Sequence, residues 1–279
     1  MTSLLSRALS VSREDGALVL VKKTLQELYT VLYCRAMSFR EYYSLTLNGH
    51  TIEFSTPTST MVKRNLNRFQ SEQKELQAFV DAIEVEDTVY DVGANTGIYS
   101  LFAATKCRRG MVVAFEPYRP NIDILKQDIA RNGFSNIEVV ESALSDVAGE
   151  IKFSQPEEED VGYGSSSIDT NGDNDTIMVQ TTTGDKLVSD EELPPPNIVK
   201  IDVEGAEQLV IEGMKEVLSA PECRAVFCEV HLSGSEARSS IEDFGSSSEK
   251  LRSRLEELGF KIKEIDISRD SEITIIATK

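Results

Sequence analysis

Hydrophobic positions from residue 88 onward alternate between two patterns. Short runs rich in Val, Ile and Phe are typical of strands covered on both faces, and longer segments with apolar residues every three or four positions are typical of helices. The predicted strands cover residues 89–92, 111–115, 137–140, 197–203 and 224–230, and the predicted helices cover 98–107, 120–132, 206–218 and 246–258. This alternation predicts a parallel sheet with helices on both of its faces.

Two further pairs of β-type runs complete this part of the chain. Residues 260–267 and 272–277 are expected to form a closing antiparallel pair, because only a short turn separates them. Residues 150–154 and 176–182 are expected to be additional strands on either side of a polar, acidic segment, 155–175. We interpret that segment as a solvated loop, with a lid over a binding site as the alternative.

The N-terminal part has a different pattern. Leu18, Val21, Leu25, Leu28 and Leu32 form an apolar stripe at helical spacing, which we expect to pack on the chain's own core or else to form a dimer contact. Asn-Gly at 48–49 lies between two short β-type runs, 43–47 and 51–54, and predicts a hairpin. A helix at 67–83 should follow. We therefore divide the chain into an N-terminal extension, 1–66, and a main domain, 67–279.

The charge and composition of the chain limit the binding partners and the cellular compartment that we expect. The 29 basic and 47 acidic residues give a net charge of −18, which repels phosphate backbones, so a nucleic-acid partner is not expected. Such an acidic excess also suggests adaptation to high salt, as a hypothesis. There is no apolar run of transmembrane length, and the four cysteines have no metal-type spacing. A soluble, cytoplasmic protein with reduced thiols is the expectation.

A glycine-rich loop follows the first strand of the predicted sheet. Asp91 comes at the end of that strand, and Gly93, Asn95 and Gly97 form the spacing G-x-N-x-G before the next helix. A strand, a glycine loop and a helix N-terminus together let the backbone approach a cofactor closely. Because a dinucleotide fingerprint requires G-x-G-x-x-G, this loop favours a cofactor without a pyrophosphate.

Acidic side chains stand at the ends of several predicted strands. In an open parallel sheet these ends meet at one crevice, where ligands bind. Glu116 ends the second strand, Asp202 and Glu204 follow the fourth, and Glu229 and His231 end the fifth. A carboxylate in the position of Glu116 can accept both hydroxyls of a ribose, which fits NAD or an adenosyl ligand.

Lys200 is unusual because it lies within a predicted central strand. It shares a face with Asp202, and we expect it either to pair with Glu229 on the neighbouring strand or to extend toward solvent. His231 shares a face with Glu229 and is expected at the crevice. It is a candidate proton acceptor, and a simple surface-loop histidine is the alternative.

Four motifs occur together in this order: V-Y-D-V-G-A-N-T-G-I-Y-S at 89–100, F-E-P at 115–117, K-I-D-V-E-G-A-E at 200–207 and E-V-H at 229–231. In this set the chain resembles the FkbM family of S-adenosylmethionine-dependent methyltransferases from about residue 72 to its end. The resemblance implies a Rossmann-like seven-stranded methyltransferase sheet, mostly parallel with an antiparallel last strand, here preceded by the N-terminal helix and hairpin.

The resemblance also implies roles for individual residues. Asp91, Gly93, Asn95 and Gly97 would line the methionine end of S-adenosylmethionine and Glu116 would hold its ribose. Ser142 and Ala143 would border the adenine, and Asp202, Glu204 and His231 would face the methyl acceptor. The sequence departs from the family pattern at 181–187, T-T-T-G-D-K-L, and in the enlarged acidic segment 155–175. Both departures concern the acceptor side.

The expected reaction is an in-line methyl transfer to a hydroxyl oxygen of a sugar, a glycan or a small metabolite. His231 is the candidate base, with Asp202 or Glu204 as its orienting group or as an alternative base. No metal is expected, although the carboxylate cluster leaves open a divalent cation that binds the acceptor. The other hypotheses are an NAD-dependent oxidoreductase and a non-catalytic protein for adenosyl-ligand binding or assembly.

Overall fold

The computed structural model describes residues 28, 32–37, 39–154, 176–234, 239–269 and 271–279. The acidic segment 155–175 and most of the predicted N-terminal stripe therefore lie outside the described residues. Two members of the stripe are described: Leu28 and Leu32 are 54% and 59% exposed and so do not pack on the core. Within the described part of the chain, no helix is both long and apolar enough to cross a membrane.

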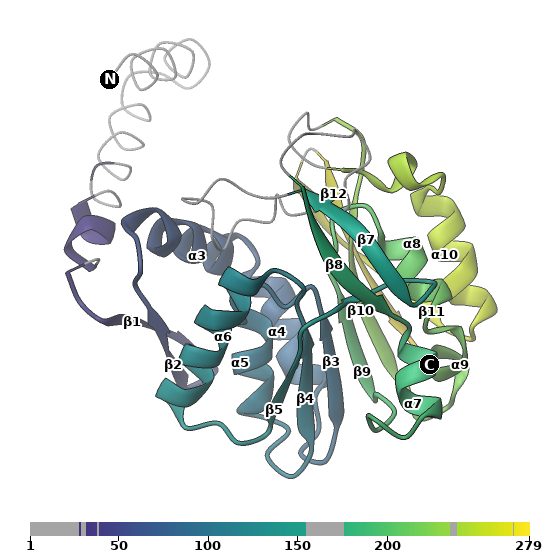
Figure 1. Cartoon of the computed structure of the whole chain (residues 1–279), viewed down its shortest axis with the longest axis horizontal. Coiled ribbons are helices and arrows are strands. Elements are labelled where there is room, and N and C mark those ends of the chain that lie inside the picture. Colours follow the sequence, from purple (N-terminus) through teal and green to yellow (C-terminus); the bar gives the residue numbers. More distant parts are fainter. Residues whose placement is uncertain (1–27, 29–31, 38, 155–175, 235–238, 270) are drawn as a thin grey trace.

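A seven-stranded sheet forms the centre of the molecule (Figure 1). Its order is β11-β12-β10-β9-β3-β4-β5. The strands β3, β4, β5, β9 and β10 run parallel, whereas β12 is antiparallel to both of its neighbours. This confirms the predicted sheet, including its antiparallel last strand. The bounds are β3 Thr88–Val92, β4 Met111–Phe115, β5 Ile137–Val140, β9 Ile198–Ile201, β10 Ala225–His231, β11 Lys261–Arg269 and β12 Glu272–Thr278.

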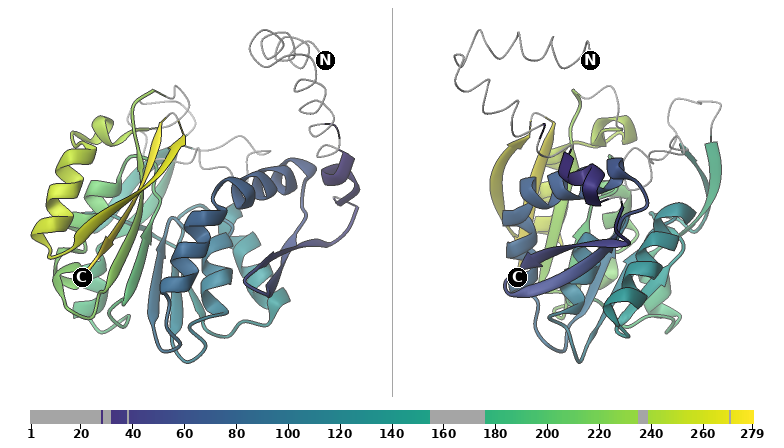
Figure 2. Two further views of the ribbon diagram at one scale, coloured as in Figure 1. Left: turned by 180° about the vertical axis from the view of Figure 1, so that it is seen from behind. Right: turned by 90° about the vertical axis from the view of Figure 1, so that its left-hand side faces the viewer.

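Helices cover both faces of the sheet, as Figures 1 and 2 show. Adjacent residues of one strand pack on opposite faces. Val89 joins an apolar cluster with the hairpin and the helices that precede and follow β3, and Tyr90 joins a cluster with the later helices. The first face is covered by α4 Gln73–Ala82 and α5 Ile98–Ala104, and the second by α8 Glu207–Glu212, α9 Lys215–Ser219 and α10 Ser248–Glu257. Further helical elements include α6 Arg119–Asn132, α7 Gly184–Ser189 and η2 Ile241–Phe244.

Two predicted helices are each divided in the structure. The predicted helix 206–218 breaks near Gly213, where a Cβ atom would lie 1.9 Å from the backbone oxygen of Ser145. The predicted helix 67–83 is replaced by α3 Ser59–Ser71 and α4, which meet at Glu72. The helical segment starts earlier than predicted, at Ser59, because the side chain of Thr58 caps α3 by accepting a hydrogen bond from the backbone N–H of Met61.

The additional strands form a sheet of their own. β6 Ala143–Leu144 pairs in parallel with β8 Thr176–Thr182, and β7 Gly149–Ser154 pairs with β8 antiparallel. Phe153 of β7 and Val179 of β8 pack against Tyr118, next to the N-terminus of α6. This small sheet is thereby fixed beside the carboxyl ends of β4 and β5.

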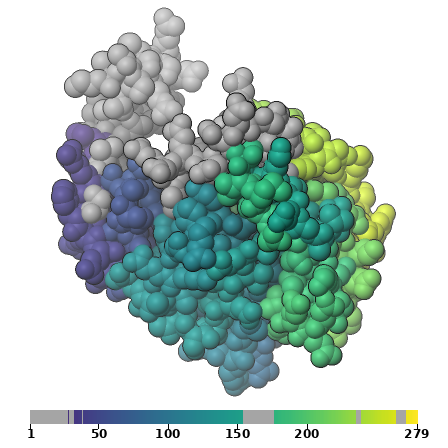
Figure 3. All heavy atoms as spheres, viewed as in Figure 1, coloured from purple at the N-terminus to yellow at the C-terminus, as the bar shows by residue number. Residues whose placement is uncertain are grey.

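The predicted hairpin is confirmed as β1 Tyr42–Leu47 and β2 His50–Ser55. Asn48 and Gly49 both have positive φ, at 51° and 78°, as a two-residue turn of this type requires. In Figure 3 the purple N-terminal part abuts the teal segments that follow it. The boundary at residue 66 falls inside α3, and the division into an extension and a main domain stays a prediction.

Two side chains of α6 hold the hairpin. Asp128 Oδ1 accepts hydrogen bonds from the backbone N–H and the hydroxyl of Ser55, at 2.9 and 2.5 Å. Asn132 accepts from the backbone N–H of Glu53 and donates to its carbonyl, at 2.9 and 2.8 Å. Burial raises the pKa of Asp128 to about 6 despite the Ser55 hydrogen bonds. The hairpin is thus attached to the main sheet through specific polar contacts as well as apolar packing.

Asp128→Ala should lower the free energy of unfolding by about 1–3 kcal/mol, because the buried backbone N–H of Ser55 then lacks its acceptor. Urea titration followed by circular dichroism measures the change. Asp128→Asn is the matched control, since it keeps an acceptor oxygen and should remain within about 1 kcal/mol of the wild type. Equal stability of all three proteins would show that this contact does not anchor the hairpin.

Candidate active site

A cavity of about 330 Å³ opens at the carboxyl ends of the central strands. It lies where the strand order reverses between β3 and β9, the position at which open α/β sheets bind ligands. The predicted site residues in its wall are Gly93, Asn95, Glu116, Ala143, Asp202, Glu204 and His231. Asp91, Gly97 and Ser142 are not part of the wall.

The glycine loop is shaped by its packing as well as by the cavity. Gly93, Asn95 and Gly97 all have positive φ, from 54° to 89°. A Cβ atom on Gly93 would lie 2.0 Å from the backbone oxygen of Asp202, and one on Gly97 would lie 2.3 Å from Leu125. Gly97 therefore packs against α6 and is not part of the cavity wall, and its predicted contact with the cofactor stays a prediction. Gly93 is needed for close contact between the β3 and β9 loops, and it also borders the cavity.

Glu116 ties the glycine loop to the end of β4. Its Oε2 accepts a hydrogen bond from the backbone N–H of Asn95 at 2.8 Å, and its Oε1 accepts from that of Tyr118 at 2.9 Å. Asn121 is a further, longer donor at 3.4 Å. Burial raises the pKa of Glu116 to about 7, although these hydrogen bonds oppose the rise. A buried carboxylate at the cavity wall is suited to accept hydroxyl donors from a ligand.

Asp91 does not lie in the cavity wall as predicted. Its side chain is fully buried, and its contacts are with residues behind the wall. The hydroxyl of Ser100 donates to its Oδ2 at 2.6 Å, and Lys200 Nζ lies 3.7 Å from its Oδ1. Lys200 also lies 3.1 Å from Asp202 Oδ2 and 4.3 Å from the centre of the Tyr99 ring. Burial alone would lower the pKa of Lys200, but the charges of Asp202 and Asp91 raise it. Lys200 therefore stays charged between two carboxylates.

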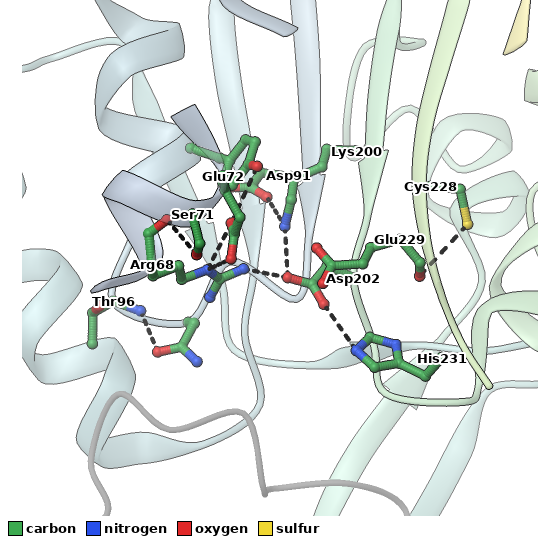
Figure 4. Close-up of polar contacts among 12 residues, drawn as sticks. Arg68, Ser71, Glu72, Asp91, Thr96, Lys200, Asp202, Cys228, Glu229 and His231 are labelled. Atoms are coloured by element: carbon green, nitrogen blue, oxygen red, sulfur yellow. Dashed lines mark hydrogen bonds and ion pairs between the residues drawn. The ribbon is translucent and has the colours of Figure 1, made fainter. Parts of the chain in front are cut away.

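A second cation reaches Asp202 from the N-terminal part of the chain (Figure 4). Arg68 of α3 forms an ion pair with Asp202 Oδ2 and places its Nε 3.0 Å from Glu72 Oε2. Tyr99 also donates to Glu72, at 3.2 Å. The pKa of Asp202 is held well below its usual range, because Lys200 and Arg68 outweigh the effect of burial.

His231 lies at the end of β10, facing Asp202 from the other side. Its Nδ1 is 2.8 Å from Glu207 Oε1, and its Nε2 is 3.9 Å from Asp202 Oδ1. Burial alone would lower the pKa of His231, but the hydrogen bond to Glu207 and the nearby carboxylates raise it to about 9. Burial and the charges of Asp202 and Glu72 raise the pKa of Glu229 well above its usual range. His231 is buried, so it is not a surface-loop residue.

Asp202, Glu229 and His231 also form a group that could hold a metal. One ligand atom from each lies within 4.8 Å of the others. However, Asp202 already forms ion pairs with two positively charged side chains, Arg68 and Lys200. These two fixed cations already supply part of the charge compensation that a divalent ion would bring.

Sequence reasoning missed four residues of this network: Arg68, Glu72, Tyr99 and Glu207. Arg68 and Glu72 lie before the recognised motifs, and nothing in their local pattern distinguishes them from solvated helix residues. Glu207 belongs to the K-I-D-V-E-G-A-E motif, so its position was a usable signal. Glu204, which was predicted together with Asp202 as the orienting group or an alternative base, lines the cavity, and its backbone φ is 46°.

Comparison with known proteins decides the family. The methyltransferase FkbM domain matches residues 91–262, well over half of the chain. The chain belongs to the FkbM methyltransferase family. This confirms the resemblance found in the sequence, and with it S-adenosylmethionine as the cofactor. The matched region begins at Asp91, so α3 with Arg68 lies outside it.

A curated relative is similar over most of its length. The hexuronic acid methyltransferase AglP of Haloferax volcanii is 30% identical over 185 residues, which cover 66% of this chain and 72% of that protein. Among solved structures, the methyltransferase FkbM from Methylobacillus flagellatus aligns with a TM-score of 0.48 at 12% identity, over 91% of this chain and 60% of that chain. A SAM-dependent methyltransferase from Aquifex aeolicus aligns with a TM-score of 0.46 at 13% identity, over 78% and 96%.

Glu116→Gln should weaken binding of S-adenosylhomocysteine roughly 10- to 100-fold, because the ribose hydroxyls lose a charged acceptor. In the wild type, the affinity should be constant above about pH 8 and should fall as the pH drops below about 7, where free Glu116 takes up a proton. In the variant this dependence should vanish. Isothermal titration calorimetry across this pH range measures both effects.

Glu138→Gln is the matched control, since Glu138 is exposed on β5 and should not affect binding. If Glu116→Gln bound the ligand as the wild type does, with the same pH dependence, Glu116 would not hold the ribose.

Proposed function

We propose that this protein transfers the methyl group of S-adenosylmethionine to an oxygen atom of a sugar or glycan, with other small-metabolite hydroxyls as the wider acceptor class. One observation carries the proposal: a single cavity contains both the cofactor-type wall of Gly93, Asn95 and Glu116 and the polar pair Asp202 and His231. A methyl donor and an acceptor placed in one cavity can react directly, without a covalent enzyme intermediate.

On the cofactor side, Glu116 would accept hydrogen bonds from the ribose hydroxyls. Gly93 and Asn95 would border the methionine end of the cofactor. Asp91 would not contact the cofactor, and it would contribute by helping to hold Lys200 in place. Ala143, Leu144 and Phe153 add apolar surface to the wall, which suits the adenine ring. S-adenosylmethionine, when bound, supplies a positively charged sulfonium with a transferable methyl carbon.

On the acceptor side, Asp202, Glu204 and His231 would hold the reacting hydroxyl in line with the methyl carbon. As the oxygen–carbon bond forms, the sulfur–carbon bond breaks and its electron pair stays on sulfur in S-adenosylhomocysteine. The hydroxyl proton passes to Nε2 of a neutral His231. Orientation can lower the barrier by about 7–11 kcal/mol, and a positioned base can add about 10²–10⁴ in rate.

We infer that the acceptor is a sugar that carries an acidic group. The relative AglP acts on a hexuronic acid by its name, which supports this choice. The chain has a net charge of −18, yet α3 brings Arg64 to the cavity wall, in addition to Arg68, which is paired with Glu72 and Asp202. Positive charge in an otherwise acidic protein favours an anionic ligand at that place.

Two further proposals concern the setting of the reaction. We place the protein in the cytoplasm, which is supported by its four cysteines being buried, free thiols. A homodimer through the N-terminal helix remains a proposal, supported by the exposure of Leu28 and Leu32.

The test is incubation with S-adenosylmethionine and a panel of glycosides, followed by mass spectrometry for an added methyl group. Hexuronic acid glycosides should be methylated faster than the matching neutral hexosides. His231→Ala should lower turnover about 10²–10⁴-fold without weakening S-adenosylhomocysteine binding, because only the proton acceptor is lost. EDTA should leave turnover unchanged.

His50→Ala is the control, since His50 is the other of the chain's two histidines and lies on the hairpin. Full turnover of the His231→Ala protein would remove the base assignment. Loss of activity in EDTA, restored by a divalent cation, would assign Asp202, Glu229 and His231 to a metal instead. Binding of NAD without binding of S-adenosylhomocysteine would favour the oxidoreductase alternative.

A further inference from the structure

Glu207 makes the closest polar contact of the His231 ring. It begins α8, and its side chain is fully buried. Its Oε1 accepts a hydrogen bond from the backbone N–H of Gly205 at 2.9 Å and lies 2.8 Å from His231 Nδ1. The backbone N–H of His231 approaches the same oxygen at 3.4 Å. The loop after β9, α8 and the end of β10 therefore meet at one carboxylate oxygen.

This contact determines which ring nitrogen faces the cavity. A carboxylate only accepts hydrogen bonds, so Nδ1 must carry the proton. Nε2 is then the atom with a lone pair when the ring is neutral. It lies 3.9 Å from Asp202 Oδ1, a separation too long for a hydrogen bond, and both residues line the cavity.

We propose that Glu207 is the positioning residue of His231, fixing its tautomer and its ring orientation so that Nε2 receives the acceptor proton. The inference rests on the proposed methyl transfer. Glu204 and Asp202 were the candidates for this role from sequence. Glu204 lies in the cavity wall, and the closest contacts of Asp202 are with Arg68 and Lys200.

The charges around His231 come from several elements. Glu207 faces it from α8, Asp202 from the loop after β9, and Glu229 lies two residues before it on β10. Glu272 of β12 is its partner in strand register. Arg68 and Lys200 oppose these carboxylates through Asp202. Glu207 is the largest contribution that raises the pKa of His231, so it both orients the ring and shifts to higher pH the range in which the ring is neutral and Nε2 can accept a proton.

These two effects predict changes in the pKa of His231 and in the pH profile of kcat/KM that substitution of a purely structural residue would not cause. Removing its charge should move the pKa of His231 from about 9 toward its ordinary value of 6.5. The rising limb of kcat/KM against pH should shift to lower pH by the same amount. The plateau at high pH should nevertheless fall, since the ring is less firmly held.

The experiment compares the full-length wild type with Glu207→Gln, which has the same shape without the charge. NMR titration of the histidine rings reports the pKa and the tautomer directly, and assignment is simple because the chain has two histidines. Glu216→Gln, an exposed glutamate on α9, is the control and should match the wild type. Glu207→Asp, which restores the charge on a shorter side chain, should recover part of the pKa shift.

An unchanged His231 pKa and tautomer in Glu207→Gln would overturn the proposal, whatever the activity. A shifted pKa with an unchanged plateau of kcat/KM would overturn the positioning role. If the pKa of His231 shifts in Glu207→Gln but the wild type methylates no glycoside, the proposed acceptor reaction is wrong. The conclusion that Glu207 fixes the tautomer and the pKa of His231 would still be supported.

Discussion

Charge compensation by Lys200 is the interaction on which the rest of the site depends. Asp91 and Asp202 end adjacent parallel strands, and their carboxylates would be costly to bury together without a cation. Lys200 lies within β9, in strand register with Asp91, and its ammonium group is placed between the two. The aromatic face of Tyr99 covers it. A lysine in a central strand is thus explained by the acids on either side.

Arg68 also compensates the negative charge of Asp202, and it comes from a part of the chain outside the region that matches the family. The matched region starts at Asp91, whereas Arg68 lies on α3 and contacts both Glu72 and Asp202. The hairpin and α4 pack into the same apolar cluster as α5 and one face of the sheet. The N-terminal elements therefore help to build the cavity wall beside Asp202.

The sequence predicted the sheet well because its strands are buried on both faces and leave continuous apolar runs. Glu116 and His231 were predictable for the same reason: strand ends converge at one edge. Arg68 could not be predicted, since its contact with Asp202 spans 134 positions and leaves no periodic signal. The break of the helix at Gly213 depends on the approach of Ser145 from a distant loop. Long-range packing of this kind is invisible to local patterns.

A crystal structure of the protein with S-adenosylhomocysteine tests the central claim most directly, because it locates the cofactor without assuming an acceptor. The account predicts both ribose hydroxyls within about 3 Å of the Glu116 carboxylate. It also predicts the sulfur atom beside Gly93, directed toward Asp202 and His231. A ligand bound away from Glu116, or a sulfur atom facing away from His231, would contradict the account.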